Sequence, residues 1–98
     1  MSLSNAQLRY LRGLCHDLKP IIYVGQKGLS DNLLAELEAA LAHHELVKVK
    51  IQAEDRAGRD EIGESLATRT GAEMVQRVGH VVCLFRRNPE KQRIELPG

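Results

Sequence analysis

The chain has 98 residues, a net charge of +1 and 43% hydrophobic residues, enough for one domain with a modest core. Its two cysteines, Cys15 and Cys83, lie in apolar patterns typical of small buried side chains, as in proteins of a reducing compartment. The first residues do not resemble a secretory leader, and the longest fully apolar run, 81–85, is too short to span a membrane. We therefore expect a cytoplasmic protein with no membrane partner.

Charge is unevenly distributed along the chain despite the near-neutral total. Residues 1–30 hold four Lys/Arg and one acid, whereas residues 31–45 hold four acids and no Lys/Arg. Residues 54–64 hold five acids and two arginines, and residues 65–98 hold six basic and three acidic residues. This pattern predicts separate basic and acidic surfaces.

Hydrophobic periodicity and turn residues predict an α/β fold with the order α-β-α-β-α-β-β. A capping box at Ser4 and Gln7 starts the first helix, Gly71 suits the end of the third, and Gly79 suits a hairpin turn. The first strand is fully apolar and is expected to be covered on both faces. The predicted elements are helices at 5–17, from a cap at Ser30 or Asp31 to 43 or 44, and at 57–70, and strands at 21–24, 46–51, 73–78 and 81–86.

The whole chain, 1–98, is expected to form a single domain of two or three layers. No internal repeat or domain boundary interrupts it. Residues 91–98 have no clear period and are expected to form a loosely ordered tail, with Ile94 and Leu96 as anchoring residues.

The segment Gly25-Gln26-Lys27-Gly28 follows the first strand and precedes a capped helix. Three features of this segment favour the binding of an anion: the free N–H groups at a helix start, the close backbone approach that glycine allows, and the charge of Lys27. The spacings of the common nucleotide-binding motifs are absent. A Gly-x-x-Gly loop is instead similar to the loop with which KH domains clamp a nucleic-acid backbone. The residues alone leave a purely structural turn as an equal alternative.

Several basic residues extend this candidate RNA-binding site. Lys48 and Lys50 share one face of a predicted strand and, with Lys19 and Lys27, form a potential basic strip for phosphates; a solvated edge is an equal alternative. The remaining basic candidates are Arg9, Arg12, Arg86 and Arg87. The only aromatic residues other than histidine are Tyr10, Tyr23 and Phe85, so we expect recognition of RNA backbone and shape rather than base stacking.

The sequence contains no catalytic constellation. His43, His44 and Glu45 are adjacent and would point in different directions on a helix, so favourable charge at a helix end explains them better than metal binding. Cys15 and His16 are likewise neighbours that do not face each other. We expect no catalytic residue, metal, cofactor or small-molecule substrate.

Three segments in order resemble the CRM domain (chloroplast RNA splicing and ribosome maturation), and in particular the bacterial stand-alone YhbY-like proteins. They are Leu18-Lys19-Pro20, the strand leading into Gly25-Gln26-Lys27-Gly28-Leu29, and the segment from His44 to Lys50. The resemblance covers nearly the full length. It implies a four-stranded mixed sheet with packed helices, similar to the C-terminal domain of bacterial translation initiation factor three.

The resemblance also implies a non-catalytic RNA-binding protein that associates with precursors of the large ribosomal subunit and assists their assembly. Carried over by position, Gly25, Gln26, Lys27 and Gly28 would be the loop that faces RNA. An alternative from the charge pattern is a protein-interaction adaptor that docks through its acidic second and third helices.

Overall fold

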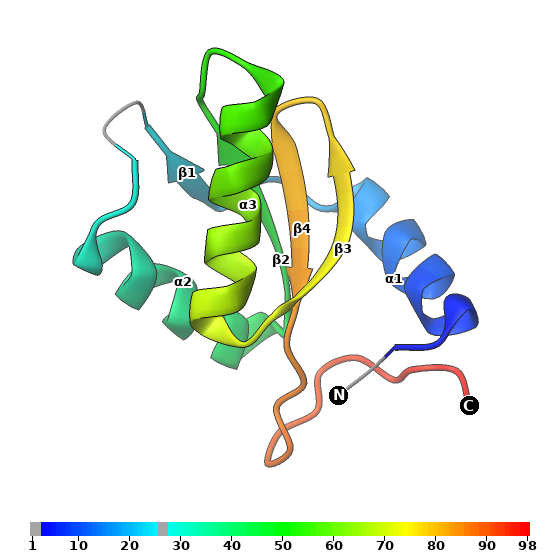
Figure 1. Cartoon of the computed structure of the whole chain (residues 1–98). Helices are drawn as coiled ribbons and strands as arrows, with labels where there is room; N and C mark the ends of the chain where they lie inside the picture. The colour runs from blue at the N-terminus through cyan, green and yellow to red at the C-terminus, as the bar shows by residue number, and fades with distance from the viewer. Residues whose placement is uncertain (1–2, 26–27) are drawn as a thin grey trace.

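The computed structural model describes residues 3–25 and 28–98 (Figure 1). Its elements in chain order are α1 (Asn5–Asp17), β1 (Ile22–Val24), α2 (Asp31–His44), β2 (Leu46–Ile51), α3 (Arg56–Thr70), β3 (Glu73–Val78) and β4 (Val81–Phe85). The predicted order of elements is confirmed, and the predicted boundaries are correct to within one residue. None of the described helices is long and apolar enough to cross a lipid bilayer.

The four strands form one mixed sheet in the order β1-β2-β4-β3. β1 pairs in parallel with β2, whereas β4 is antiparallel to both β2 and β3. β1 and β3 are therefore the two edge strands. The parallel pair is joined through α2, and the antiparallel hairpin is closed by the predicted turn at Gly79 and His80.

Helices cover both faces of the sheet, so the domain has three layers (Figure 1). α2 and α3 pack on one face around a core that includes Leu37, Leu41 and Leu66. α1 packs on the other face through Leu11 and Cys15. The buried residues that the strands contribute to the α2/α3 side are Ile22, Val24, Val47, Val49, Ile51, Val82 and Leu84, and those on the α1 side are Leu46, Val75, Cys83 and Phe85.

Local capping interactions fix the helix ends. Ser4 accepts a hydrogen bond from the Gln7 backbone N–H at 3.1 Å while the Gln7 side chain accepts from the Ser4 N–H, which completes the predicted capping box. Ser30, rather than Asp31, is the N-cap of α2. Gly71 ends α3 with a φ of 69°, a left-handed conformation that glycine adopts without steric cost.

The expectation that the first strand is covered on both faces is wrong. Ile22 and Val24 are buried under α2, but Tyr23 is 61% exposed and Ile21 is 47% exposed on the opposite face. The reason is the length of α1, which ends at Asp17 and leaves this corner of the sheet open. An apolar run in the sequence does not show whether a second layer is long enough to cover it.

The segment after β4 has no regular secondary structure but is attached to the domain at several points. Ile94 and Leu96 pack against the α1-side core, as expected for anchoring residues. Gln7 donates its side-chain amide to the Pro97 carbonyl at 3.1 Å. The backbone N–H groups of Arg93 and Ile94 donate to the Glu45 carboxylate at 2.6 and 2.9 Å. The predicted tail therefore helps to close the α1 side of the core.

Candidate nucleic-acid interface

The Gly25–Gly28 loop leaves the sheet at the end of edge strand β1. Gly28 donates its N–H to the Gly25 carbonyl at 3.0 Å and has a φ of 79°, which favours glycine. Gln26 and Lys27 lie outside the described residues. A Cβ added at Gly25 would meet no described heavy atom within 4 Å, so the described packing does not require glycine there. Close approach by a ligand is a second reason for glycine at such a position.

Three of the predicted lysines lie on the α1 side of the sheet: Lys50 near this loop, Lys48 level with the start of β1, and Lys19 before that strand, at the end of β1 away from the loop. Lys50 pairs in register with Tyr23, which lies two residues before Gly25. The Lys50 side chain is exposed. Lys19 is exposed in the connection between α1 and β1. Lys48 lies on the same strand face as Lys50, one row closer to α1. The predicted shared face of Lys48 and Lys50 is thus present on a central strand.

Lys48 contributes to the fold through the end of α1. Its ammonium donates to the Cys15 carbonyl at 2.8 Å and to the Leu18 carbonyl at 3.0 Å. These carbonyls belong to the last turn of a helix, where intrahelical partners are missing and a positive charge is favourable. Two of the three ammonium N–H groups are therefore engaged in the fold.

Replacing Lys48 by methionine is expected to lower the free energy of unfolding by about 1–2 kcal/mol, because a charge-assisted cap is lost while the stem is kept. The matched variant Lys50→Met removes an exposed ammonium from the same strand face and should cost less than about 0.5 kcal/mol. Urea unfolding of both variants measures the difference. Equal stabilities would show that the carbonyl contacts of Lys48 do not stabilise α1.

Arg86 and Arg87 do not extend the basic strip, contrary to the sequence-based prediction. They follow β4, which runs antiparallel to β2 and ends at the opposite end of the sheet from the Gly25–Gly28 loop (Figure 1). Arg86 pairs with Glu38 at 2.7 Å and donates to the Thr70 carbonyl at 2.9 Å. Arg87 donates to the buried Glu45 carboxylate at 3.2 Å. Both guanidinium groups hold the fold together.

Arg9 and Arg12 are exposed on α1 but lie apart from the loop. Arg12 donates from Nε to the Val75 carbonyl at 3.3 Å, on edge strand β3. β3 and β1 are the two opposite edges of the sheet, so Arg12 and the loop after β1 are separated by its full width. The structure thus divides the predicted set into lysines on the α1-side face and arginines that lie at the far edge or far end of the sheet.

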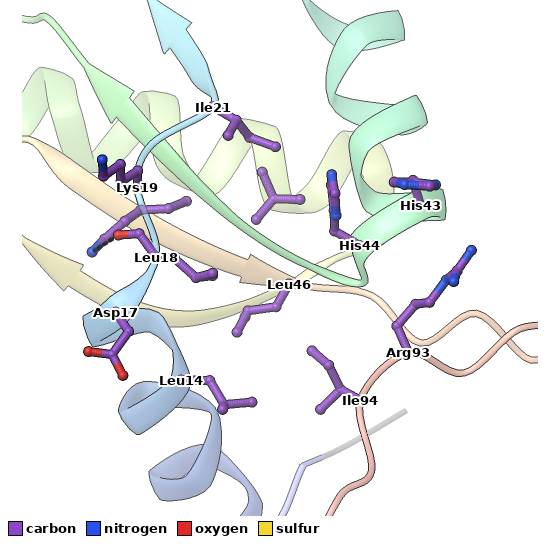
Figure 2. A pocket seen from close by; sticks show the side chains of 12 residues that line it. Leu14, Asp17, Leu18, Lys19, Ile21, His43, His44, Leu46, Arg93 and Ile94 are labelled. Carbon is purple, nitrogen blue, oxygen red and sulfur yellow. Dashed lines mark hydrogen bonds between the residues drawn. The ribbon is translucent and has the colours of Figure 1, made fainter.

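A groove of about 630 Å³ adjoins the lysine-bearing face (Figure 2). Leu14, Leu46 and Ile94 give it an apolar lining. Figure 2 shows Lys19 on the wall formed by the α1–β1 connection, and His43, His44 and Arg93 on the opposite wall. Asp17 is the acidic residue among those that line it. Sequence reasoning did not connect Arg93 or the histidines with this site, since their positions depend on how the tail and α2 pack.

Acidic residues are concentrated on the other side of the domain. α2 carries Asp31, Glu36 and Glu38 at exposed positions, and α3 with its preceding turn adds further acids. Near the loop, Glu54 and Gly25 line one small hollow on the α3 side. A polyanion held at the loop would therefore be repelled from the α2/α3 layer and attracted to the face with Lys19 and Lys50.

The described residues offer little for metal binding. Within 3–25 and 28–98 there is no cluster of three or more His, Cys, Asp or Glu side chains suited to a metal ion. Glu45 is fully buried and its oxygens accept internal hydrogen bonds, whereas His43 and His44 lie exposed. Cys15 is also fully buried, and its contact with Cys83, followed by burial, raises the pKa of the Cys15 thiol.

Comparison with known proteins decides the family. Residues 3–86 match the profile of the CRS1 / YhbY (CRM) domain. The chain belongs to the CRM domain family. The resemblance seen in the sequence is thereby confirmed, and the lysine-bearing face, the Gly-x-x-Gly loop and the acidic helices are features of this CRM domain.

Full-length relatives share the domain. The chain is 42% identical over 96 residues to a Haemophilus influenzae protein named an RNA-binding protein, with 98% of this chain and 96% of that one covered. It is 33% identical to the Bacillus subtilis protein YqeI, named a probable RNA-binding protein, with 97% and 99% covered. The solution structure of a Staphylococcus aureus protein superposes with a TM-score of 0.84 at 33% identity, covering 98% of this chain and all of that one.

Proposed function

We propose that this CRM domain is a non-catalytic RNA-binding protein that grips the RNA backbone at the Gly25–Gly28 loop and acts in assembly of the large ribosomal subunit. The observation that carries the proposal is the separation of charge across the sheet. Lys19, Lys48 and Lys50 lie on the α1 side, on the face that runs from the α1–β1 connection toward the loop, whereas acidic residues concentrate in the α2/α3 layer. Such a surface attracts a polyanion on one side only.

The loop suits a phosphate contact for physical reasons. It precedes α2, whose first-turn N–H groups lack intrahelical partners. Among the described residues, the Ser30 side chain accepts a hydrogen bond from one of these groups, the N–H of Leu33. The absence of described packing around Gly25 leaves room for a backbone to approach. Lys27, by its place in the sequence, adds a cation to the same loop.

The names of the relatives support RNA as the partner, and the role in ribosome assembly rests on the family resemblance. Precursors of the large subunit are the partner that we propose, and the cytoplasm is the proposed location. No cofactor, metal or small-molecule substrate enters the proposal.

The variant Lys27→Glu is expected to bind RNA from the large ribosomal subunit about tenfold more weakly than the wild type at 100 mM salt. The slope of log affinity against log salt concentration should fall by about one, because one phosphate contact is lost. Filter binding at several salt concentrations measures both quantities. Sedimentation of tagged protein with ribosomal precursors, compared between the two forms, tests the assembly role.

Lys91→Glu is the matched control, since it makes the same charge change on the segment after β4, at the opposite end of the sheet. The RNA affinity of this control should stay within about twofold of the wild-type affinity, as expected for a charge outside the contact with RNA. Equal affinities of wild type and Lys27→Glu at every salt concentration would contradict the role of the loop. Absence of RNA binding by the wild type, with a defined protein partner bound by α2 and α3, would instead favour the adaptor function.

A further inference from the structure

We infer that the uncovered part of the α1-side sheet face binds an unpaired RNA base, which stacks on the ring of Tyr23. This inference rests on the proposed RNA-binding function and adds the kind of RNA element that the site recognises. It depends on the strand register, on the exposure of the side chains and on the charges around them.

The strand register places four side chains in one row across the sheet. Registered partners in adjacent strands project from the same face. The pairs are Tyr23 with Lys50, Lys50 with Val81, and Val81 with Val78. The row therefore crosses all four strands, from edge strand β1 to edge strand β3.

This row lies beyond the end of α1 and remains open. Tyr23 and Val78, at its two ends, are each 61% exposed. The next row toward α1 is different, because Cys83 is buried and Lys48 binds the carbonyls at the end of the helix. Apolar side chains gathered on one open face of a small protein commonly mark a binding site.

Tyr23 is held in a position suited to stacking. Its hydroxyl donates to the Pro20 carbonyl at 3.2 Å, which restrains the ring while most of the residue stays exposed. Gly25 follows two residues later, about 7 Å along the strand. Because the hydroxyl bond turns the ring toward Pro20, away from Gly25, the stacked base belongs to a nucleotide adjacent to the one whose phosphate is held at the loop, and it lies over Tyr23 in the row that also carries Lys50.

The charges around the row favour a nucleic acid as its ligand over an acidic or a neutral protein segment. A hollow of about 200 Å³ between α1 and the row is lined by His16, Lys48, Gln76, Val78, Val81 and Cys83. No acidic side chain is among these lining residues, all of which lie in the part of the chain that the structure describes. Beyond Ile21 the same face continues into the groove of Figure 2, whose rim carries Lys19. Apolar floor and cationic rim together match a base and its phosphates.

This inference changes the expectation drawn from composition. Few aromatic residues in a sequence argue against extended base stacking, and Phe85 is indeed buried. A single stacked base, however, requires only one exposed ring in the correct place. Tyr23 meets that requirement because β1 is an edge strand whose α1 side is uncovered.

The test compares the affinities of Tyr23→Ala, Tyr23→Phe and Tyr10→Ala for RNA from the large ribosomal subunit, using the full chain. Tyr23→Ala should weaken binding by about 5- to 100-fold, the range for loss of one stacked base. Tyr23→Phe keeps the ring, so its RNA affinity should stay within about twofold of the wild-type affinity. Tyr10→Ala removes the other exposed tyrosine, on α1, and should also have little effect. Photocrosslinking from position 23 should mark unpaired nucleotides.

The outcomes separate this inference from the proposed function. If Lys27→Glu weakens RNA binding but Tyr23→Ala does not, the stacking site is overturned and the RNA-binding function stands. If Tyr23→Phe is as weak as Tyr23→Ala, the hydroxyl rather than the ring is responsible, and stacking is overturned. Crosslinks confined to paired nucleotides, or loss of a defined protein partner with unchanged RNA affinity, would also overturn it. Wild-type protein that does not bind the RNA would refute both proposals.

Discussion

Replacing Glu45 by glutamine is expected to lower the free energy of unfolding by about 3 kcal/mol, a large fraction of the stability of a small domain. Glu45 is fully buried at the end of α2 with a φ of 64°. Its carboxylate accepts hydrogen bonds from the backbone N–H groups of Asn88, Arg93 and Ile94 at 2.6, 2.6 and 2.9 Å. Arg87 adds a guanidinium donor at 3.2 Å. A glutamine side chain would leave the Arg87 guanidinium without a charged partner. Its amide N–H groups would also point at the backbone N–H groups, which are themselves donors.

The same carboxylate makes stability depend on pH. Burial by itself would raise the pKa of Glu45, but the N–H groups of Asn88, Ile94 and Arg93 and the Arg87 guanidinium together hold it below its ordinary value. A carboxyl whose pKa is lower in the folded protein than in the unfolded chain stabilises the fold at pH values above its unfolded pKa of about 4.3. That contribution is lost as the pH falls through the lower pKa that Glu45 has in the folded protein. Wild-type stability should therefore decrease below about pH 4.3, and Glu45→Gln should show a weaker decrease.

Urea unfolding between pH 3 and pH 7 measures both effects, and hydrogen exchange at the amides of Asn88, Arg93 and Ile94 tests their cause. The matched control is Glu36→Gln on the exposed face of the same helix, which should change stability by less than about 0.5 kcal/mol. If Glu45→Gln and Glu36→Gln were equally stable, or if their acid transitions coincided, the buried carboxylate would not anchor the tail.

A leucine at Gly63 is expected to destabilise the domain by about 2–3 kcal/mol, because it overfills the contact between α3 and the sheet. Gly63 is buried inside α3, and a Cβ there would lie 3.1 Å from Met74 Cε and 3.3 Å from Val82 Cγ1. The methyl end of Met74 is flexible, but Val82 belongs to a central strand. The close approach of helix and strand thus depends on the missing side chain.

Two variants isolate the cause. Gly63→Ala should stay within about 1 kcal/mol of the wild type, since better helix propensity offsets mild crowding. Gly13→Leu places the same leucine in α1, where an added Cβ meets no described atom within 4 Å, and should be neutral or stabilising. Thermal or urea unfolding compares all three. A Gly63→Leu protein as stable as Gly13→Leu would show that the packing at Gly63 can relax.

Local chemistry made most of the secondary structure predictable. The capping box of Ser4 and Gln7, and the Gly71 helix end, depend on residues within one or two turns of each other. The alternation over 46–51 likewise needs no knowledge of the partner strands, and it correctly placed Lys48 and Lys50 on one face, although Leu46 on that same face is buried under α1. For the same reason the loop at Gly25–Gly28 was recognisable, because strand, glycine turn and helix start are consecutive.

The roles of individual charged residues were not predictable, because their partners are far away in the sequence. Lys48 binds carbonyls 33 and 30 residues earlier, and Arg87 binds a carboxylate 42 residues earlier. A count of basic residues treats such side chains and the exposed Lys50 as equivalent. Only the packing of α1 against β2, and of the tail against α2, separates structural cations from available ones.

The sequence by itself determined the elements, their order and the position of the candidate anion-binding loop, since these follow from contacts between near neighbours in the chain. The tertiary structure alone decided which face of the sheet is open and which charges border it. Strand order β1-β2-β4-β3 and the short α1 expose Tyr23 beside Lys50, while β4 carries Arg86 and Arg87 to the far end. Both outcomes depend on contacts between distant segments, which local patterns do not encode.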